Sequence, residues 1–342
     1  MPNVVDMNKL RGYGRRLRDM LIPGGLILSY HRVADTALDP WGVAVSPGHF
    51  EEHLAVIRRF GQPIRLSQLT DRLKEGKSVK GTVALTFDDG YADNYSNAYP
   101  LLEKYDTPAT IFLVSGTIAA RRAFWWEELN ALLLRPSCLP PVLELPIRGS
   151  THRIELAEAA VYSEADRRRD MASSIWHAEP GTRLHFYREV WELLQQLTAS
   201  EQAVALNHLR EWASLPSSTL VRPLSMSAQQ IRSLASTGLI DIGGHTVTHA
   251  KLPCHDEDYQ RNEIETDKTT LEEIIEGPVT SFAYPHGAHC PTTLRLVQAA
   301  GYKRACAGAW GRVRSRANPF LLPRYEVSNW DSDRFARHFF PQ

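Results

Sequence analysis

Short runs of apolar residues recur along the chain, and each is bounded by glycine, proline or polar residues. Short continuous apolar runs without alternating polar positions are typical of strands buried on both faces, as in parallel sheets. The predicted strands are residues 25–30, 82–87, 109–114, 239–242 and 279–284.

Segments between these runs carry apolar residues at helical spacing. The predicted helices are residues 47–60, 95–105, 227–237 and 256–276. Strands that alternate with helices predict an α/β domain built on a parallel sheet or barrel.

Residues from about 117 to 225 interrupt this alternation. The segment is rich in helix formers, tryptophan and arginine, and its two strand-like runs, 142–147 and 151–156, are expected to form a hairpin around Gly149-Ser150. We interpret the segment as a mainly helical insertion into one α/β domain that spans residues 24–342, and not as a separate domain with its own chemistry.

Composition and charge exclude several classes of protein. Hydrophobic residues make up 43% of the chain and the formal net charge is zero, so a nucleic-acid partner is not expected. The four cysteines form no CxxC pair, which argues against a disulfide framework and a thiolate zinc site. We see no apolar run long enough to span a bilayer and no signal peptide, so the expected location is cytoplasmic.

Residues 1–23 form a basic amphipathic segment. Its apolar side chains would share one helical face, and its charge comes from lysine and arginine. Such a helix can lie on an anionic membrane surface, which gives an expectation of peripheral membrane contact. The alternative interpretation is a solvated helix that packs on the domain.

The first motif with chemical potential is Thr86-Phe-Asp-Asp-Gly90, at the end of a predicted strand. Successive strand residues point to opposite sides, but a turn at Gly90 can bring both carboxylates to one cavity. Two neighbouring carboxylates repel each other unless a cation or strong donors stabilise them. The alternative is an ordinary Asp-Gly turn.

The second motif, Gly243-Gly-His-Thr-Val-Thr-His249, also follows a predicted strand. One helical turn would place His245 and His249 on one face, as in helical HxxxH metal sites. Two histidines and one carboxylate leave coordination positions for water and substrate. A third motif, Phe282-Ala-Tyr-Pro-His-Gly287, predicts a rigid loop at another strand end.

In this order the three motifs resemble those of the polysaccharide deacetylase domain (NodB homology, carbohydrate esterase family 4). The resemblance covers about residues 24–120 and 226–330 and implies a deformed (β/α)7 barrel. It implies Asp88 as the general base and the backbone N–H of Tyr91 as a donor to the oxyanion. It also implies a divalent metal, usually zinc and sometimes cobalt or nickel; the ligands would be Asp89, His245 and His249.

Two departures from the commonest family pattern narrow this resemblance. Ala283 stands where many members have an arginine that holds the catalytic aspartate, and a late Leu-x-His motif is missing. The Tyr-Pro-x-Gly form and the early segment Tyr30-His-Arg-Val33 resemble the branch that deacetylates poly-N-acetylglucosamine exopolysaccharides. That branch implies His31 as the general acid and Arg324 as the cationic partner of Asp88. The alternatives are a structural histidine and a surface arginine.

The expected function is therefore metal-dependent removal of N-acetyl groups from sugars of a glycan or its precursor, including a lipid-linked sugar. An O-acetyl esterase, an amidase for other substrates and a non-catalytic glycan-binding protein are the alternatives. The complete Asp-Asp and HxxxH sets argue against the last. Sugar-binding grooves usually offer aromatic platforms, and the candidates are Trp125, Trp126, Trp310 and Trp330.

Overall fold

The computed structural model describes residues 24–36, 38–120, 123–215 and 224–341. The predicted N-terminal amphipathic helix, residues 1–23, lies outside the described residues. Within the described part, none of the helices combines the length and the apolar character needed to cross a bilayer.

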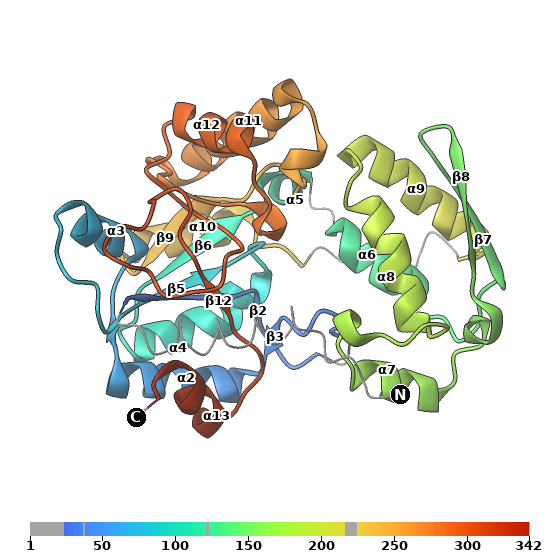
Figure 1. The fold of residues 1–342 in the computed structure, drawn as a ribbon, viewed down its shortest axis with the longest axis horizontal. Helices are drawn as coiled ribbons and strands as arrows, with labels where there is room; N and C mark the ends of the chain where they lie inside the picture. The colour runs from blue at the N-terminus through green and yellow to red at the C-terminus, as the bar shows by residue number, and fades with distance from the viewer. Residues whose placement is uncertain (1–23, 37, 121–122, 216–223, 342) are drawn as a thin grey trace, which may run out of the picture.

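A parallel sheet forms the centre of the α/β part (Figure 1). Seven strands follow one another in the order β11-β10-β9-β6-β5-β1-β12, and β4 pairs with β5. Their bounds are β1 (Leu26–Tyr30), β4 (Gln62–Pro63), β5 (Thr82–Phe87), β6 (Ala109–Leu113), β9 (Ile240–Gly244), β10 (Ser281–Ala283), β11 (Arg304–Cys306) and β12 (Tyr325–Glu326). All five predicted strands are confirmed, while β4, β11 and β12 are too short to produce a sequence pattern.

The sheet curves into an irregular barrel because one C-terminal segment contacts β11 at one edge of the sheet and β1 at the other. Leu322 forms a parallel bridge with Cys306 of β11, and Tyr325 of β12 pairs with Leu28 of β1. Because β12 is only two residues long, and the contact with β11 is a single bridge, the barrel is not closed by a continuous ladder of hydrogen bonds. The predicted deformed α/β barrel is confirmed in this form.

Helices surround the sheet, with α2, α4 and α13 on one side and α10, α11 and α12 on the other (Figure 1). The bounds are α2 (Pro47–Phe60), α3 (Leu66–Lys74), α4 (Tyr99–Lys104), α5 (Ser115–Ala120), α10 (Ala228–Ser236), α11 (Glu257–Ile275), α12 (Pro291–Ala299) and α13 (Ser332–Phe339). The predicted helices are confirmed, except that the one expected at 95–105 begins with a π-helical turn, η1 (Asn94–Ala98). Helix α2 begins at the predicted residue because Ser46 caps the N–H of His49 and Pro47 suits the first turn.

The segment between β6 and β9 contains a hairpin and several helices, which lie beside the barrel at the right of Figure 1. The helices include α6 (Trp125–Leu133), α7 (Glu164–Met171), α8 (Arg183–Leu194) and α9 (Ala199–Trp212), and the antiparallel hairpin pairs β7 (Val142–Ile147) with β8 (Ser150–Glu155). The predicted hairpin is thus confirmed. These elements bury a hydrophobic cluster of their own, distinct from the cluster on the barrel strands.

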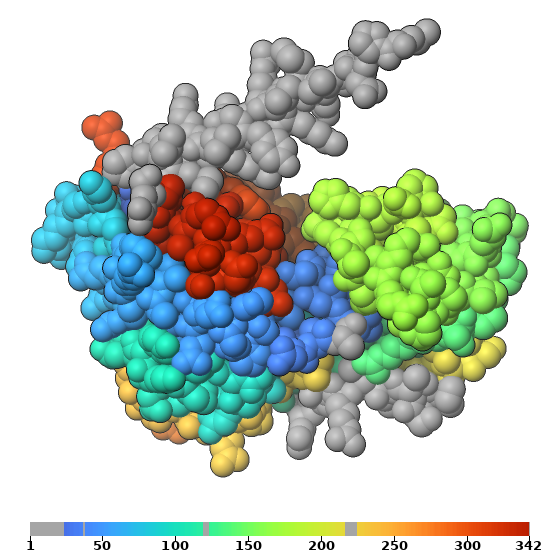
Figure 2. Space-filling view, turned by 90° about the horizontal axis from the view of Figure 1, so that it is seen from below, coloured from blue at the N-terminus to red at the C-terminus, as the bar shows by residue number. Residues whose placement is uncertain are grey.

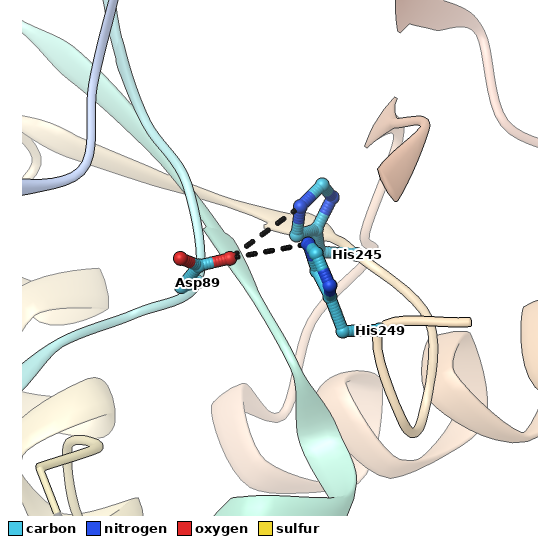
Figure 3. A group of neighbouring side chains, drawn as sticks. All are labelled: Asp89, His245 and His249. Carbon is cyan, nitrogen blue, oxygen red and sulfur yellow. Dashed lines mark ion pairs between the residues drawn. The ribbon is translucent and has the colours of Figure 1, made fainter. Parts of the chain in front are cut away.

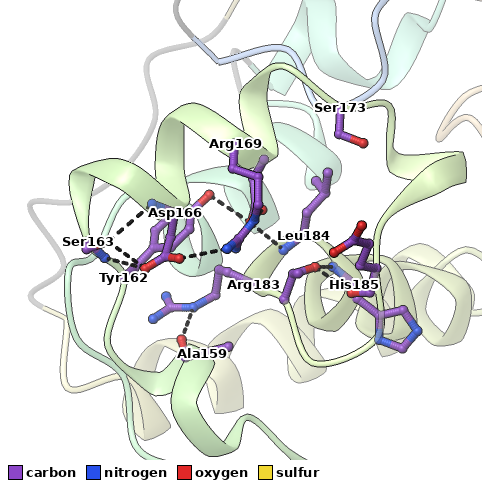
Figure 4. Close-up of polar contacts among 12 residues, drawn as sticks. Ala159, Tyr162, Ser163, Asp166, Arg169, Ser173, Arg183, Leu184 and His185 are labelled. Carbon is purple, nitrogen blue, oxygen red and sulfur yellow. Dashed lines mark hydrogen bonds and ion pairs between the residues drawn. The ribbon is translucent and has the colours of Figure 1, made fainter.

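Arg183, fully buried within this segment, connects several of its elements (Figure 4). Its guanidinium donates to the carbonyl oxygens of Leu133 at 2.9 Å, Ala159 at 2.8 Å and Ala160 at 3.0 Å. Leu133 ends α6, and the two alanines end the 3-10 turn η2 (Ala157–Ala160). Carbonyls at helix ends lack partners within the helix, so a single side chain satisfies three of them.

Candidate active site

The side chains of the first two motifs meet at the carboxyl ends of neighbouring strands. Asp88 and Asp89 follow β5, while His31 follows β1 and His245 follows β9. Pairing of Tyr30 with Phe87 aligns β1 with β5, and the Asp88 N–H donates to the Tyr30 carbonyl oxygen at 2.9 Å. All four side chains line one pocket of about 660 Å³.

A tight turn brings the adjacent carboxylates of Asp88 and Asp89 to this pocket. Asp89 (φ 69°) and Gly90 (φ 78°) both have left-handed backbone conformations. A Cβ at position 90 would lie 2.4 Å from Cδ2 of Leu113, so the turn needs glycine there. A non-glycine residue such as Asp89 in this region costs free energy, and such strain is concentrated at functional sites.

Asp89, His245 and His249 form a group that could hold a metal ion (Figure 3). Oδ1 of Asp89 lies 3.7 Å from Nε2 of His245 and 3.5 Å from Nε2 of His249. Donor atoms around tetrahedral zinc, with bonds of about 2.0–2.1 Å, lie about 3.4 Å apart. The same Asp89 oxygen is buried and has no hydrogen-bond partner in the described part of the chain. These residues therefore fit a divalent cation.

The predicted helical turn through His245 and His249 is wrong, because the structure places both residues in a loop. Thr246 (φ 67°) and His249 (φ 60°) have left-handed conformations that no regular helix contains. The imidazoles still face each other, with ring centroids 4.9 Å apart. Backbone turns in the loop therefore bring the two imidazoles together, which the spacing predicted a helical turn would do.

Two carboxylates of α11 hold this loop in place. Glu263 accepts hydrogen bonds from the N–H and the hydroxyl of Thr248, both at 2.9 Å. Asp267 accepts from the N–H of His245 at 3.1 Å and from that of Ser115 at 3.3 Å. Sequence reasoning missed both carboxylates, because they lie inside an ordinary amphipathic helix.

The glycine pair before His245 was the available signal for these contacts. A Cβ at Gly244 would lie 2.6 Å from Oδ2 of Asp267 and 2.3 Å from the Tyr302 hydroxyl. A glycine here therefore marks a close approach between the loop and α11.

Hydrogen bonding and burial prepare His245 to bind a cation. Nδ1 lies 2.7 Å from the Ala283 carbonyl oxygen, so it carries the proton and leaves the Nε2 lone pair toward Asp89. Burial lowers the pKa of His245 to about 4, although the charge of Asp88 opposes this shift. Burial also lowers the pKa of His249. Neutral imidazoles can bind a metal without first losing a proton.

The pKa of Asp89 is shifted in the opposite direction from that of Asp88. Burial raises the pKa of Asp89 to about 7, and the charge of Asp88 acts in the same direction. A bound dication would remove this cost by stabilising the carboxylate. The carboxylate and the cation thus depend on each other at this position.

Arg324 pairs with both carboxylate oxygens of Asp88. Its Nη1 and Nη2 donate to Oδ1 and Oδ2, each at 2.7 Å, and Nη1 also reaches the Thr86 hydroxyl at 3.1 Å. Arg324 is only 8% exposed, so the alternative of a surface arginine is wrong and the pairing is confirmed. Burial alone would raise the pKa of Asp88, but the charges of Arg324 and His245 hold it well below its usual range.

His31 and Tyr91 complete the predicted set in this pocket. Nδ1 of His31 is buried without a hydrogen-bond partner among the described residues, so no carboxylate occupies it there. The Tyr91 hydroxyl donates to Glu127 at 2.9 Å and accepts from the Trp126 indole at 2.8 Å. Within the described chain, the backbone N–H of Tyr91 donates to no backbone carbonyl and remains available.

The tryptophan candidates divide into two pairs. Trp126 and Trp310 line the pocket. Trp125 and Trp330 do not line it, since Trp125 packs inside the insertion and Trp330 packs on the barrel core. Trp41, Trp176 and Trp191 also line the pocket and were missed, because only the tertiary fold brings them there.

Comparisons with known proteins agree with this geometry. A family model described as polysaccharide deacetylase matches residues 75–137 and 189–305, more than half of the chain. YxkH of Bacillus subtilis (strain 168) is 32% identical over 108 residues, which are 31% of this chain and 37% of that protein. The poly-β-1,6-N-acetyl-D-glucosamine N-deacetylase of Escherichia coli (strain K12) is 34% identical over 88 residues, 25% of this chain and 13% of that protein. The chain thus spans well under half the length of these curated relatives.

A solved structure resembles nearly the whole chain. The Streptococcus pyogenes deacetylase PplD, in complex with acetate, has a TM-score of 0.58 at 17% identity and covers 94% of this chain and 100% of its own. This likeness supports the assignment of the fold, and the match to the family model supports membership of the family. The chain therefore belongs to the polysaccharide deacetylase family.

Proposed function

We propose that the protein is a metal-dependent hydrolase that removes N-acetyl groups from the sugars of a glycan or its precursor. The observation that carries this proposal is one pocket in which an arginine-paired Asp88 lies beside the Asp89, His245 and His249 group. The name of the E. coli relative supports N-acetylglucosamine units as the substrate class.

Asp88 is suited to act as the general base. A divalent cation, when bound, would lower the pKa of water and polarise the acetyl carbonyl. The low pKa of Asp88 keeps this carboxylate ionised, and Arg324 fixes its two oxygens in one orientation. A base must already be deprotonated and within reach of the proton it accepts.

His31 and Tyr91 have the remaining two roles in this proposal. An amide can be cleaved only if its departing amine receives a proton, and an imidazole such as that of His31 can donate one. The available backbone N–H of Tyr91 would donate to the oxygen that becomes negative as the carbonyl is attacked. Both groups line the same pocket as Asp88.

We propose zinc as the cation. Two imidazoles and one carboxylate are common protein ligands in catalytic zinc sites, and they leave a position for water or substrate. Cobalt and nickel accept the same ligands, so the metal is to be decided by reconstitution. We also propose a cytoplasmic protein that acts on a glycan or lipid-linked precursor, with the N-terminal segment in peripheral contact with a membrane.

The test is acetate release by chelator-treated protein that is refilled with zinc, cobalt or nickel. The substrates are N-acetylglucosamine, its β-1,6- and β-1,4-linked oligomers, a lipid-linked N-acetylglucosamine and an O-acetylated xylo-oligosaccharide. Acetate from the N-acetyl substrates, restored by metal, supports the proposal. Acetate from the O-acetyl substrate alone would make the protein an esterase, and no acetate from any of them would refute the hydrolase.

Asp88→Asn tests the base. The variant should keep its bound zinc and lose at least about 10²-fold in kcat, the usual contribution of acid–base catalysis. Asp106→Asn is the matched control, because Asp106 is exposed, lies outside the pocket and has a left-handed conformation that asparagine tolerates. Full activity in Asp88→Asn would contradict the assignment.

A further inference from the structure

The residue that follows the Asp88-Asp89-Gly90 turn has its side chain in the core of the insertion. Tyr91 is 2% exposed and belongs with Trp126 to the hydrophobic cluster of the insertion, and not to the cluster on the barrel strands. Figure 2 shows the green insertion beside the blue segment of the barrel part, and the Ile175 N–H donates to the Pro40 carbonyl oxygen between them at 3.2 Å. The backbone of Tyr91 thus continues the barrel, while its ring packs in the insertion.

Two hydrogen bonds hold the Tyr91 hydroxyl, and both come from helix α6 of the insertion. Glu127 accepts from this hydroxyl at 2.9 Å, and the indole N–H of Trp126 donates to it at 2.8 Å. Trp126 and Glu127 are consecutive residues in the first turn of α6. The hydroxyl therefore uses its one proton and one of its lone pairs, so the end of the side chain is fixed relative to α6.

The ring of Tyr91 is contacted by a cation from the barrel part and by an aromatic ring from the insertion. The Arg32 guanidinium lies over the ring at 4.8 Å from its centroid, and the Phe124 ring lies 4.8 Å away, measured between centroids. Arg32 belongs to β2 (Arg32–Val33), and its Nε donates to Asp93 at 3.0 Å. Both kinds of contact depend on the orientation of the ring, so together with the hydrogen bonds they limit how this side chain can turn.

The chain that returns from the insertion to the barrel holds the backbone on both sides of Tyr91. The Met226 N–H donates to the Gly90 carbonyl oxygen at 3.0 Å, and the Ala92 N–H donates to the Leu224 carbonyl oxygen at 2.6 Å. Tyr91 thereby forms an antiparallel bridge whose two hydrogen bonds are made by its neighbours. In a pair of this kind the N–H of the central residue points away from the partner chain. The insertion thus fixes this backbone and leaves the Tyr91 N–H available on the other side.

We propose that the insertion positions the backbone N–H of Tyr91 for catalysis, through the contacts of Trp126 and Glu127 with the Tyr91 hydroxyl. The inference rests on the proposed function, in which this N–H donates to the oxygen that becomes negative as the carbonyl is attacked. Trp126 and Glu127 are then positioning residues, which act through the side chain of Tyr91.

The turn before Tyr91 explains why such support is needed. Asp89 and Gly90 both have left-handed backbone conformations, and a strained conformation persists only where the surrounding structure over-determines it. A donor to an oxyanion is effective when it is in place before the charge develops. Displacement of a catalytic group by about 1 Å can cost about 10²-fold in rate. An anchor for Tyr91 in the insertion therefore matters for the reaction as well as for the fold.

Tyr91→Phe tests the anchor, because it removes the hydroxyl and keeps the ring. The kcat for acetate release from N-acetylglucosamine oligomers should fall about 10–100-fold while KM changes less than about twofold, since an oxyanion donor acts in the transition state. Tyr162→Phe is the matched control. Tyr162 is a buried tyrosine of the insertion, outside the pocket, whose hydroxyl donates to Asp170 at 3.2 Å. Its phenylalanine variant should keep the wild-type kcat.

Glu127 also lines the pocket, so a direct contact with substrate is the competing explanation for its effect on activity. Glu127→Met removes the acceptor and should lower kcat as Tyr91→Phe does. Glu127→Gln keeps an oxygen that can accept from Tyr91 and should recover most of the kcat lost in Glu127→Met. Tyr91→Phe combined with Glu127→Met should be no slower than the slower single variant, because both changes break the same hydrogen bond. Losses that multiply would overturn the proposal.

Amide hydrogen exchange needs no substrate, so it separates this inference from the proposed function. The N–H groups of Ala92 and Asn94, bonded to the carbonyl oxygens of Leu224 and Tyr91, should exchange faster in Tyr91→Phe and at the wild-type rate in Tyr162→Phe. No acetate release by the wild type would refute the deacetylase, and the exchange rates alone would then decide whether the insertion holds this turn. Equal exchange in the two variants, or a wild-type kcat in Tyr91→Phe, would overturn the positioning role and leave the deacetylase in place.

Discussion

Arg324 donates a hydrogen bond to each carboxylate oxygen of Asp88, both at 2.7 Å, although 236 positions separate the two residues in the chain. The contact exists because the segment that closes the barrel passes between β11 and β1. Position 283, where many family members carry their arginine, contributes a backbone carbonyl to His245. Asp88 thus pairs with an arginine that lies just before β12, and not with a residue at position 283.

Removing this arginine should destabilise the protein more than removing the whole pair. Arg324→Met leaves the Asp88 carboxylate buried without its partner, a change that costs about 3–5 kcal/mol in comparable buried pairs. Adding Asp88→Asn removes the charge, so the double variant should lose less stability than Arg324→Met alone, and therefore less than the sum of the single variants. Urea unfolding of the metal-free proteins measures all four free energies. Additive losses would show that the two residues do not act as a pair.

Asp267→Asn should weaken metal binding without destroying the catalytic groups. Asp267 accepts one N–H on each oxygen, from Ser115 and His245. Asparagine keeps only one acceptor oxygen and turns an amide group toward the other N–H, so the His245 loop should lose its position. Loss of such supporting contacts typically lowers metal affinity about 10–100-fold.

Competition with a chromogenic chelator measures the zinc affinity of Asp267→Asn. Activity at saturating zinc should return close to the wild-type kcat, which a general loss of structure would not permit. The control is Glu265→Gln, on an exposed position of the same helix. Unchanged zinc affinity in Asp267→Asn would mean that α11 does not position the loop.

His53 should make the stability of the barrel depend on pH. It is fully buried, stacks on Phe335 at 4.0 Å and lies 2.7 Å from the Trp330 carbonyl oxygen. Burial lowers its pKa from an ordinary value of 6.5 to about 4. The unfolded chain therefore binds a proton more readily, and the stability contribution is present above pH 6.5 and lost as pH falls toward 4.

The size of this effect follows from the shift, which corresponds to about 3 kcal/mol between the two protonation states. The free energy of unfolding of metal-free wild type should rise with pH between 4 and 6.5 more steeply than that of His53→Gln. Glutamine cannot titrate but can still donate to the Trp330 carbonyl. Parallel curves for the two proteins would exclude His53 as a source of the pH dependence.

Arg183→Met should loosen the insertion while the barrel remains folded. The change leaves the carbonyls of Leu133 and Ala159 without the guanidinium donor, and each unsatisfied group costs about 1–3 kcal/mol, whereas the carbonyl of Ala160 keeps the N–H of Leu139. Amide hydrogen exchange should become faster in α6, α8 and α9 and stay slow in β5 and β6. Arg153→Met, at an exposed position of the hairpin, is the control. Equal exchange changes in both parts would contradict a locally acting Arg183.

Much of the fold was predictable because its determinants are local. Continuous apolar runs identified β1, β5, β6, β9 and β10, since a strand buried on both faces requires them. The Asp88-Asp89-Gly90 turn was predictable for the same reason, as a left-handed residue after a strand favours glycine. Strand ends in turn placed most of the candidate catalytic groups along one rim.

Tertiary structure alone decided the parts that depend on contacts between distant segments. The loop conformation of His245 and His249 is imposed by α11, so spacing of four residues wrongly indicated a helix. Trp176 and Trp191 reach the pocket only because the insertion folds around its own core and lies against the barrel. Local patterns report the conformation of neighbouring residues, whereas a site is completed by side chains whose proximity comes from the closed fold.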